Sequence, residues 1–70
     1  MYMHKLVGVM HEKGISQNAA SKHLGISDVS FRKYLKTNGF TLKQAAELGE
    51  LLEVRDPSEF MSIFFEKAVN

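Results

Sequence analysis

The feature that most constrains the fold of this chain is a short break, Gly25-Ile26-Ser27, between two segments of helical character. The segments cover about 17–24 and about 28–36, so each allows only about two or three helical turns. Gly25 suits the left-handed backbone that ends a helix, and Ser27 can cap the start of the next one. Ile26 lies between them as an apolar plug beneath the turn. This is the spacing of a helix-turn-helix.

Three further helices are predicted by start signals of the same kind. One covers about Lys5–Lys13. Another opens at Thr41, where Thr-Leu-Lys-Gln has the form of a capping box, and continues to about Leu52. The last begins within residues 56–59, Asp-Pro-Ser-Glu, which supply an N-cap, a proline at N1 and an acid at N3. This helix is predicted to cover about 57–68. We therefore expect an all-α fold of five helices.

One alternative organisation concerns the middle of the chain. Asn38-Gly39 is a strong hairpin signal, and residues 34–43 around it could form two strands. The same pair also suits a loop between helices, and Thr41 already begins a capping box. We therefore favour the loop.

Apolar residues recur at helical spacing and predict one shared core. Phe31, Tyr34 and Leu35 form such a face on the second helix of the motif. Gly49 is a weak point of its helix, because glycine costs about 1 kcal/mol relative to alanine there. The other positions expected to face inward are Leu6, Met10, Ala20, Leu24, Ala45, Leu48, Leu51 and Leu52.

In the last predicted helix, apolar residues occupy more of the helix circumference than a single narrow face. Such a surface exceeds what a small domain needs to cover its own core, so we expect part of it to contact another protein. The residues assigned to this protein interface are Phe60, Met61, Phe64 and Phe65.

Size and composition exclude several classes of function. Seventy residues form one small domain, residues 1–70, and no stretch approaches the roughly 18 apolar residues of a membrane span. The absence of cysteine removes disulfides and thiolate metal sites and is typical of a cytoplasmic protein. The histidines lack metal-ligand spacing, and neither a paired nucleophile nor a glycine-rich phosphate loop is present. We expect no enzyme, no metal, no cofactor and no small-molecule substrate.

The charge of the chain is divided unevenly along the sequence. Residues 1–44 carry seven Lys and Arg against two acids, a net +5, whereas residues 45–70 carry two against six, a net −4. Chance is one explanation in so short a chain. The other is that one face meets a polyanion while the acidic part stays solvated or meets a different partner.

Residues 17–36, Gln-Asn-Ala-Ala-Ser-Lys-His-Leu-Gly-Ile-Ser-Asp-Val-Ser-Phe-Arg-Lys-Tyr-Leu-Lys, resemble the helix-turn-helix of the Cro and CI-type phage repressors. The later segments Phe-Thr-Leu-Lys-Gln, Leu-Gly-Glu-Leu-Leu-Glu-Val and Phe-Met-Ser-Ile-Phe-Phe are similar to small Cro-like proteins of phages of Gram-positive bacteria. The resemblance covers roughly residues 4–66. It implies a five-helix, lambda-repressor-like DNA-binding domain. Such a domain would act as a homodimer on an operator in the bacterial cytoplasm and repress transcription in a lysogeny switch.

The same resemblance implies a set of DNA-contacting residues. Arg32 could pair with guanine, Val29 could touch a thymine methyl group, and Asp28 could accept from a cytosine amino group. The expected base-reading residues are Asp28, Val29, Arg32, Lys33 and Lys36. The residues expected to contact the DNA backbone are Gln17, Asn18, Lys22, Thr37, Asn38 and Lys43.

Two residues depart from the family pattern. Ser21 stands where alanine is most common, a change of little volume, and Asp28 stands where the family commonly has a neutral or basic residue. An acid at that position repels phosphate. Together with the acidic distal half, it leaves a second function open, in which the chain is an antirepressor or interaction modulator that pairs with another phage repressor.

Overall fold

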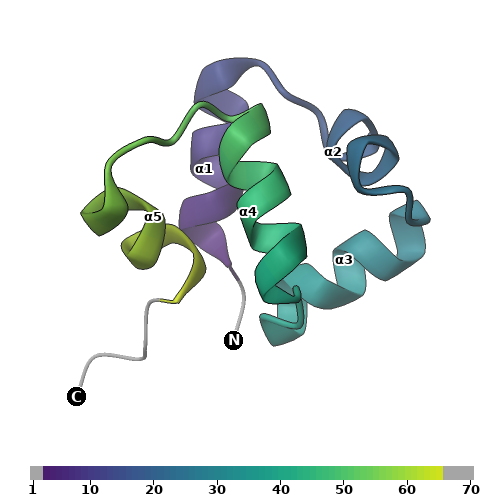
Figure 1. Cartoon of the computed structure of the whole chain (residues 1–70). Coiled ribbons are helices and arrows are strands. Elements are labelled where there is room, and N and C mark those ends of the chain that lie inside the picture. Colours follow the sequence, from purple (N-terminus) through teal and green to yellow (C-terminus); the bar gives the residue numbers. More distant parts are fainter. Residues whose placement is uncertain (1–2, 66–70) are drawn as a thin grey trace.

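Five α-helices make up the part of the chain that the computed structural model describes, residues 3–65 (Figure 1). They are α1 (His4–Lys13), α2 (Gln17–Leu24), α3 (Asp28–Thr37), α4 (Leu42–Leu51) and α5 (Pro57–Phe64). No strand occurs within residues 3–65, so the all-α prediction is confirmed and the hairpin alternative is wrong. Asn38 instead ends α3 in the left-handed conformation, with φ of 55°.

The starts of four helices follow from side chains that accept hydrogen bonds from otherwise unpaired backbone amides. Ser16 and Ser27 each accept one from the residue three positions later. Thr41 and Gln44 form a reciprocal capping box, and Asp56 caps α5 just before the proline at N1. These caps confirm the predicted starts of α2 to α5.

Three helices end in turns of one kind, with a left-handed residue followed by an apolar one. The left-handed residues are Gly14, Gly25 and Glu53, with φ of 71°, 71° and 58°. In each turn two amides bond back to the end of the helix, as where the Val54 amide donates to the Gly49 carbonyl at 2.9 Å. This is the Schellman arrangement. Glu53 adopts it at a cost of about 1 kcal/mol, since its Cβ crowds the backbone there.

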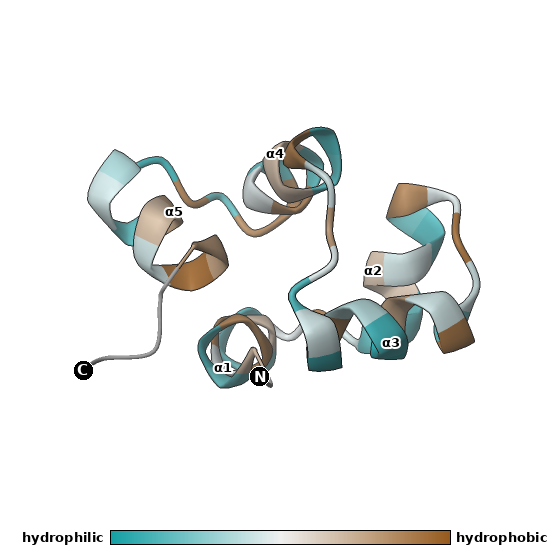
Figure 2. Cartoon of the chain, turned by 90° about the horizontal axis from the view of Figure 1, so that it is seen from below, coloured by the Kyte–Doolittle hydropathy of each residue, from teal (hydrophilic) through white to brown (hydrophobic). Residues whose placement is uncertain are grey.

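α1 and α4 lie in the middle of the molecule, with α2 and α3 on one side and α5 on the other (Figures 1 and 2). α2 packs against α3 and α4, and α5 packs against α1. The predicted core positions Leu24, Tyr34 and Leu51 are only half-buried. The buried apolar core is drawn from all five helices and the residue before them: Met3, Leu6, Met10, Ala20, Phe31, Leu35, Ala45, Leu48, Leu52, Ile63 and Phe64.

α5 is held against α4 through a glycine. The ring of Phe60 covers Gly49, and a Cβ added to Gly49 would lie 2.9 Å from the ring atom Cε2. Gly49 is therefore needed for close packing and is not merely a weak point of its helix. α5 ends at Phe64, with Phe65 as its C-cap, and the predicted end at 68 lies outside the described residues.

Candidate nucleic-acid interface

α3 has one buried and one exposed face. Phe31 and Leu35 are buried in the core, and Phe40 from the next loop packs edge-on against the Phe31 ring, with a centroid separation of 5.3 Å. The Met3 amide donates to the Leu35 carbonyl at 2.9 Å, which also ties α3 to the start of α1. The burial of one face fixes which side chains the other face presents.

The exposed face carries four of the five expected base-reading residues. Val29, Arg32, Lys33 and Lys36 stand at i, i+3, i+4 and i+7 and so share one side of the helix. All four are exposed, Val29 to 73%. With Thr37 they line a shallow hollow of about 430 Å³. We call these four residues the cationic stripe.

The cations at the centre of the stripe are not neutralised by ion pairs. Within residues 3–65, neither Arg32 nor Lys33 forms a salt bridge with an acidic side chain. The acid nearest along α3, Asp28, interacts with Arg32 only through the electrostatic field. The guanidinium and ammonium groups are thus available to an anion from outside the chain.

Asp28, the fifth expected base-reading residue, forms hydrogen bonds with two side chains of α2. Its Oδ1 lies 2.6 Å from the Ser21 hydroxyl, and Asn18 Nδ2 donates to Oδ1 and Oδ2 at 3.4 and 3.1 Å. Ser21 is only 1% exposed, and its hydroxyl has no other side-chain partner within residues 3–65. The carboxylate joins the two helices of the motif, so Asp28 has a positioning contact that the expected base-reading role did not include.

These contacts also set the charge state of Asp28. The hydrogen bonds from Ser21 and then Asn18 hold the pKa of the carboxyl below its ordinary value, and the positive charges of Arg32 and Lys22 act in the same direction. A carboxylate stabilised in this way stays ionised at neutral pH. Sequence reasoning treated Ser21 as interchangeable with alanine and so missed this pair, because the contact depends on how α2 crosses α3.

The residues expected to contact the DNA backbone lie toward the two ends of α3. Lys22 is exposed and influences Asp28 at the start of α3, and Lys43 is exposed in the first turn of α4, after the loop that follows α3. Thr37 donates its hydroxyl to the Lys33 carbonyl at 3.0 Å, and Asn38 is the half-buried C-cap. Asn18 donates its side-chain amide to Asp28, and Gln17 is half-buried at the first position of α2.

The four residues assigned to a protein interface divide into three environments. Phe64 is 1% exposed and belongs to the core, so its assignment to the interface is wrong. Phe60 is half-buried between Gly49 and the rings of Phe64 and Phe65. Met61 and Phe65 remain 55% and 40% exposed. Because α5 is apolar on two sides, its sequence alone could not show which side faces the core.

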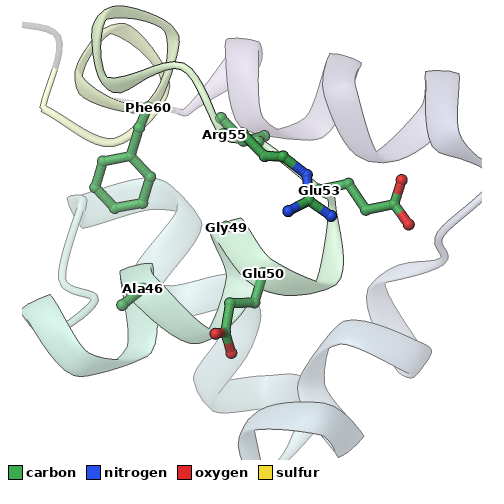
Figure 3. A pocket seen from close by; sticks show the side chains of 7 residues that line it. Ala46, Gly49, Glu50, Glu53, Arg55 and Phe60 are labelled. Carbon is green, nitrogen blue, oxygen red and sulfur yellow. The ribbon is translucent and has the colours of Figure 1, made fainter.

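A second hollow lies between α4, the loop after it and α5 (Figure 3). Its volume is about 400 Å³. The Phe60 ring stands on one side, and the side chains of Glu53 and Arg55 lie on the other (Figure 3). Its lining residues are Ala46, Gly49, Glu50, Glu53, Val54, Arg55 and Phe60. We call this hollow the acidic groove, since Glu50 and Glu53 at its edge are both exposed.

Two other kinds of site are absent from the described part of the chain. Among residues 3–65, no cluster of His, Asp or Glu side chains could hold a metal ion. In the same range, no helix has the length and apolar character needed to cross a bilayer.

No family model, no curated protein and no solved structure matches this chain. What the chain can bind is therefore inferred from its own exposed side chains.

Proposed function

We propose that this chain is a sequence-specific DNA-binding transcriptional regulator with a lambda-repressor-like helix-turn-helix. The observation that carries the proposal is the cationic stripe, which is exposed on the second helix of a tightly joined pair. An α-helix fits the major groove of DNA, and the second helix of such a pair is the one that enters it.

The side chains of the stripe have the chemistry of direct readout. Arg32 can make two parallel hydrogen bonds to the O6 and N7 atoms of guanine. Val29 is one turn away on the same face and can contact a thymine methyl group, while Lys33 and Lys36 can reach bases or phosphates. With Asp28 held by Ser21 and Asn18, sequence preference would come from Val29 and Arg32.

The distribution of charge supports the same orientation on DNA. Residues 16–44 carry five Lys and Arg against a single acid, Asp28. Residues 45–65 carry five acids against one base, Arg55. The acidic part includes α5, on the side of the molecule away from α3 (Figure 1). Docking through α3 would therefore bring the basic part to the phosphates and keep the acidic part away from them.

For a helix-turn-helix domain that reads DNA directly, occupancy of an operator is the simplest mechanism. A Cro-like regulator would bind as a homodimer to two half-sites about 34 Å apart, one helical turn of DNA, and exclude RNA polymerase. On the sequence resemblance to phage repressors, we further propose that such an operator belongs to a lysogeny switch.

The test begins with selection of bound sequences from a random duplex library. Fluorescence anisotropy then compares the selected duplex with a scrambled one. Arg32→Ala should weaken binding to the selected duplex by about 1 to 3 kcal/mol, or roughly 5- to 150-fold, with a smaller loss on the scrambled duplex. Lys5→Ala, an exposed charge change on α1, is the matched control. Equal losses on both duplexes, or no enriched sequence, would contradict the proposal.

A second function is favoured by two exposed apolar side chains, one on α5 and one at its C-cap. Met61 and Phe65 could pair with another repressor, which would make the chain an antirepressor or modulator. A gel shift with and without a candidate repressor separates the two functions. A repressor complex that forms without any DNA shift by the chain alone, and that is lost in Met61→Ser, would favour the second.

A further inference from the structure

The acidic groove has a shape and lining suited to an apolar side chain accompanied by cations. Gly49 and Ala46 leave its floor without long side chains, and the Phe60 ring forms an apolar wall (Figure 3). Glu50 and Glu53 place two exposed carboxylates at its edge, and Arg55 brings one exposed cation beside Glu53, so the charged lining remains acidic by one charge (Figure 3). A volume of about 400 Å³ admits a few side chains but not a whole helix.

The cationic stripe of the same chain has the complementary chemistry. Val29 is the most exposed large apolar side chain of the described residues, at 73%. Arg32 and Lys33 follow it by one helical turn. An apolar group next to two cations on the stripe thus matches an apolar floor next to Glu50 and Glu53 in the groove.

We propose that the acidic groove binds the cationic stripe of a second copy of this chain, in a head-to-tail contact. The stripe lies on α3 and the groove lies between α4 and α5, on opposite sides of the molecule (Figures 1 and 2). A folded chain therefore cannot place its own stripe in its own groove. A symmetric contact of two grooves would bring like charges together, since residues 45–65 carry a net −4.

The contact has two physical consequences. It is heterologous, so each copy keeps one free stripe or groove, and association grows into short chains of copies. It is also small and charged, so it is weak and strongly screened by salt, because the Debye length falls from about 10 Å at 0.1 M to about 3 Å at 1 M. If the proposed DNA function also holds, a docked stripe is hidden from DNA.

Two charge variants isolate the contact. Variant one, Arg32→Gln/Lys33→Gln, keeps the groove and loses the central cations of the stripe. Variant two, Glu50→Gln/Glu53→Gln, keeps the stripe and loses the acids of the groove. All four side chains are exposed, so both variants should fold. In sedimentation at low salt, the unaltered chain should associate with concentration, neither variant should associate alone, and an equimolar mixture should form a dimer that stops growing.

Matched controls keep the same net charges and alter other exposed residues. Lys5→Gln/Lys13→Gln on α1 and Glu12→Gln/Glu59→Gln on α1 and α5 should each associate as the unaltered chain does. Backbone amide NMR locates the contact. Labelled variant one titrated with unlabelled variant two should change at Ala46, Gly49 and Phe60, and the reverse titration should change along α3.

The proposal fails if the two variants do not pair. It also fails if the amide chemical-shift changes spread evenly over the surface, because general charge attraction would produce that pattern. It also fails if variant two still associates alone, which would indicate contact through Met61 and Phe65. Groove shifts with polylysine but none with variant two would indicate a different basic partner. None of these outcomes bears on DNA binding, which variant two retains and variant one loses if the proposed function is correct.

Discussion

Replacing Gly49 with alanine tests how closely α5 packs on α4. The new Cβ would lie 2.9 and 3.1 Å from the ring atoms Cε2 and Cδ2 of Phe60, so the ring must move. Overpacking of this kind costs about 1 to 3 kcal/mol, whereas alanine gains about 1 kcal/mol of helix propensity over glycine. The expected net effect is a loss of up to about 2 kcal/mol in the free energy of unfolding.

Gly8 provides a matched control in the middle of α1. It is exposed, and a Cβ added there meets no atom within 4 Å. Gly8→Ala should therefore show the propensity gain alone, up to about 1 kcal/mol. The difference between the two variants isolates the contact with Phe60, and for a domain of this size each 1 kcal/mol corresponds to roughly 4–8 °C in Tm.

Urea unfolding followed by circular dichroism measures both variants. In a Phe60→Leu background the ring is absent, so Gly49→Ala should lose most of its penalty. The packing argument is refuted if Gly49→Ala stabilises the chain as much as Gly8→Ala does. If the proposed function is correct, DNA binding by the folded fraction should be unchanged, since the cationic stripe lies on the other side of the molecule.

Three further predictions follow from the turns and from the contact between α2 and α3. Glu53→Gly should raise the free energy of unfolding by about 0.5 to 1 kcal/mol in urea titrations, because glycine adopts the φ of 58° without crowding, and an equal gain from Glu53→Ala would contradict this reason. Ser21→Ala should raise the pKa of Asp28, measured by a carboxyl carbon NMR titration, and an unchanged pKa would show that the hydroxyl contact has no electrostatic effect. Because the folded pKa of Asp28 is lowered, its stabilising contribution is present above the ordinary pKa of about 4 and is lost as the pH falls through the folded value. Urea midpoints should therefore fall more steeply on acidification for the unaltered chain than for Asp28→Asn, and parallel curves would contradict this linkage.

The helix boundaries could be predicted because the signals are local. Ser16, Ser27 and Thr41 each cap the helix that their sequence context indicated, and Gly25 adopts the expected left-handed turn. The left-handed turn at Glu53 could not be predicted from local sequence signals. Glutamate is not a residue that favours positive φ, and the turn forms there because its amide and that of the next residue bond back to α4.

The candidate site was only partly predictable, because its details depend on contacts between helices. The exposed stripe follows from helical periodicity once Phe31 and Leu35 are assigned to the core. The hydrogen bond between Ser21 and Asp28 depends on how α2 crosses α3, which spacing alone does not define. The burial of Phe64 likewise depends on which apolar side of α5 packs inward.

The most direct test of the central claim is an amide NMR titration of the chain with the duplex selected from the random library. Contact through the cationic stripe predicts that the largest shift changes fall on α3, from Asp28 to Thr37, and at the start of α2, while Met61 and Phe65 on the α5 side change little. Changes centred on α5, or no changes at a duplex concentration that saturates anisotropy, would contradict it.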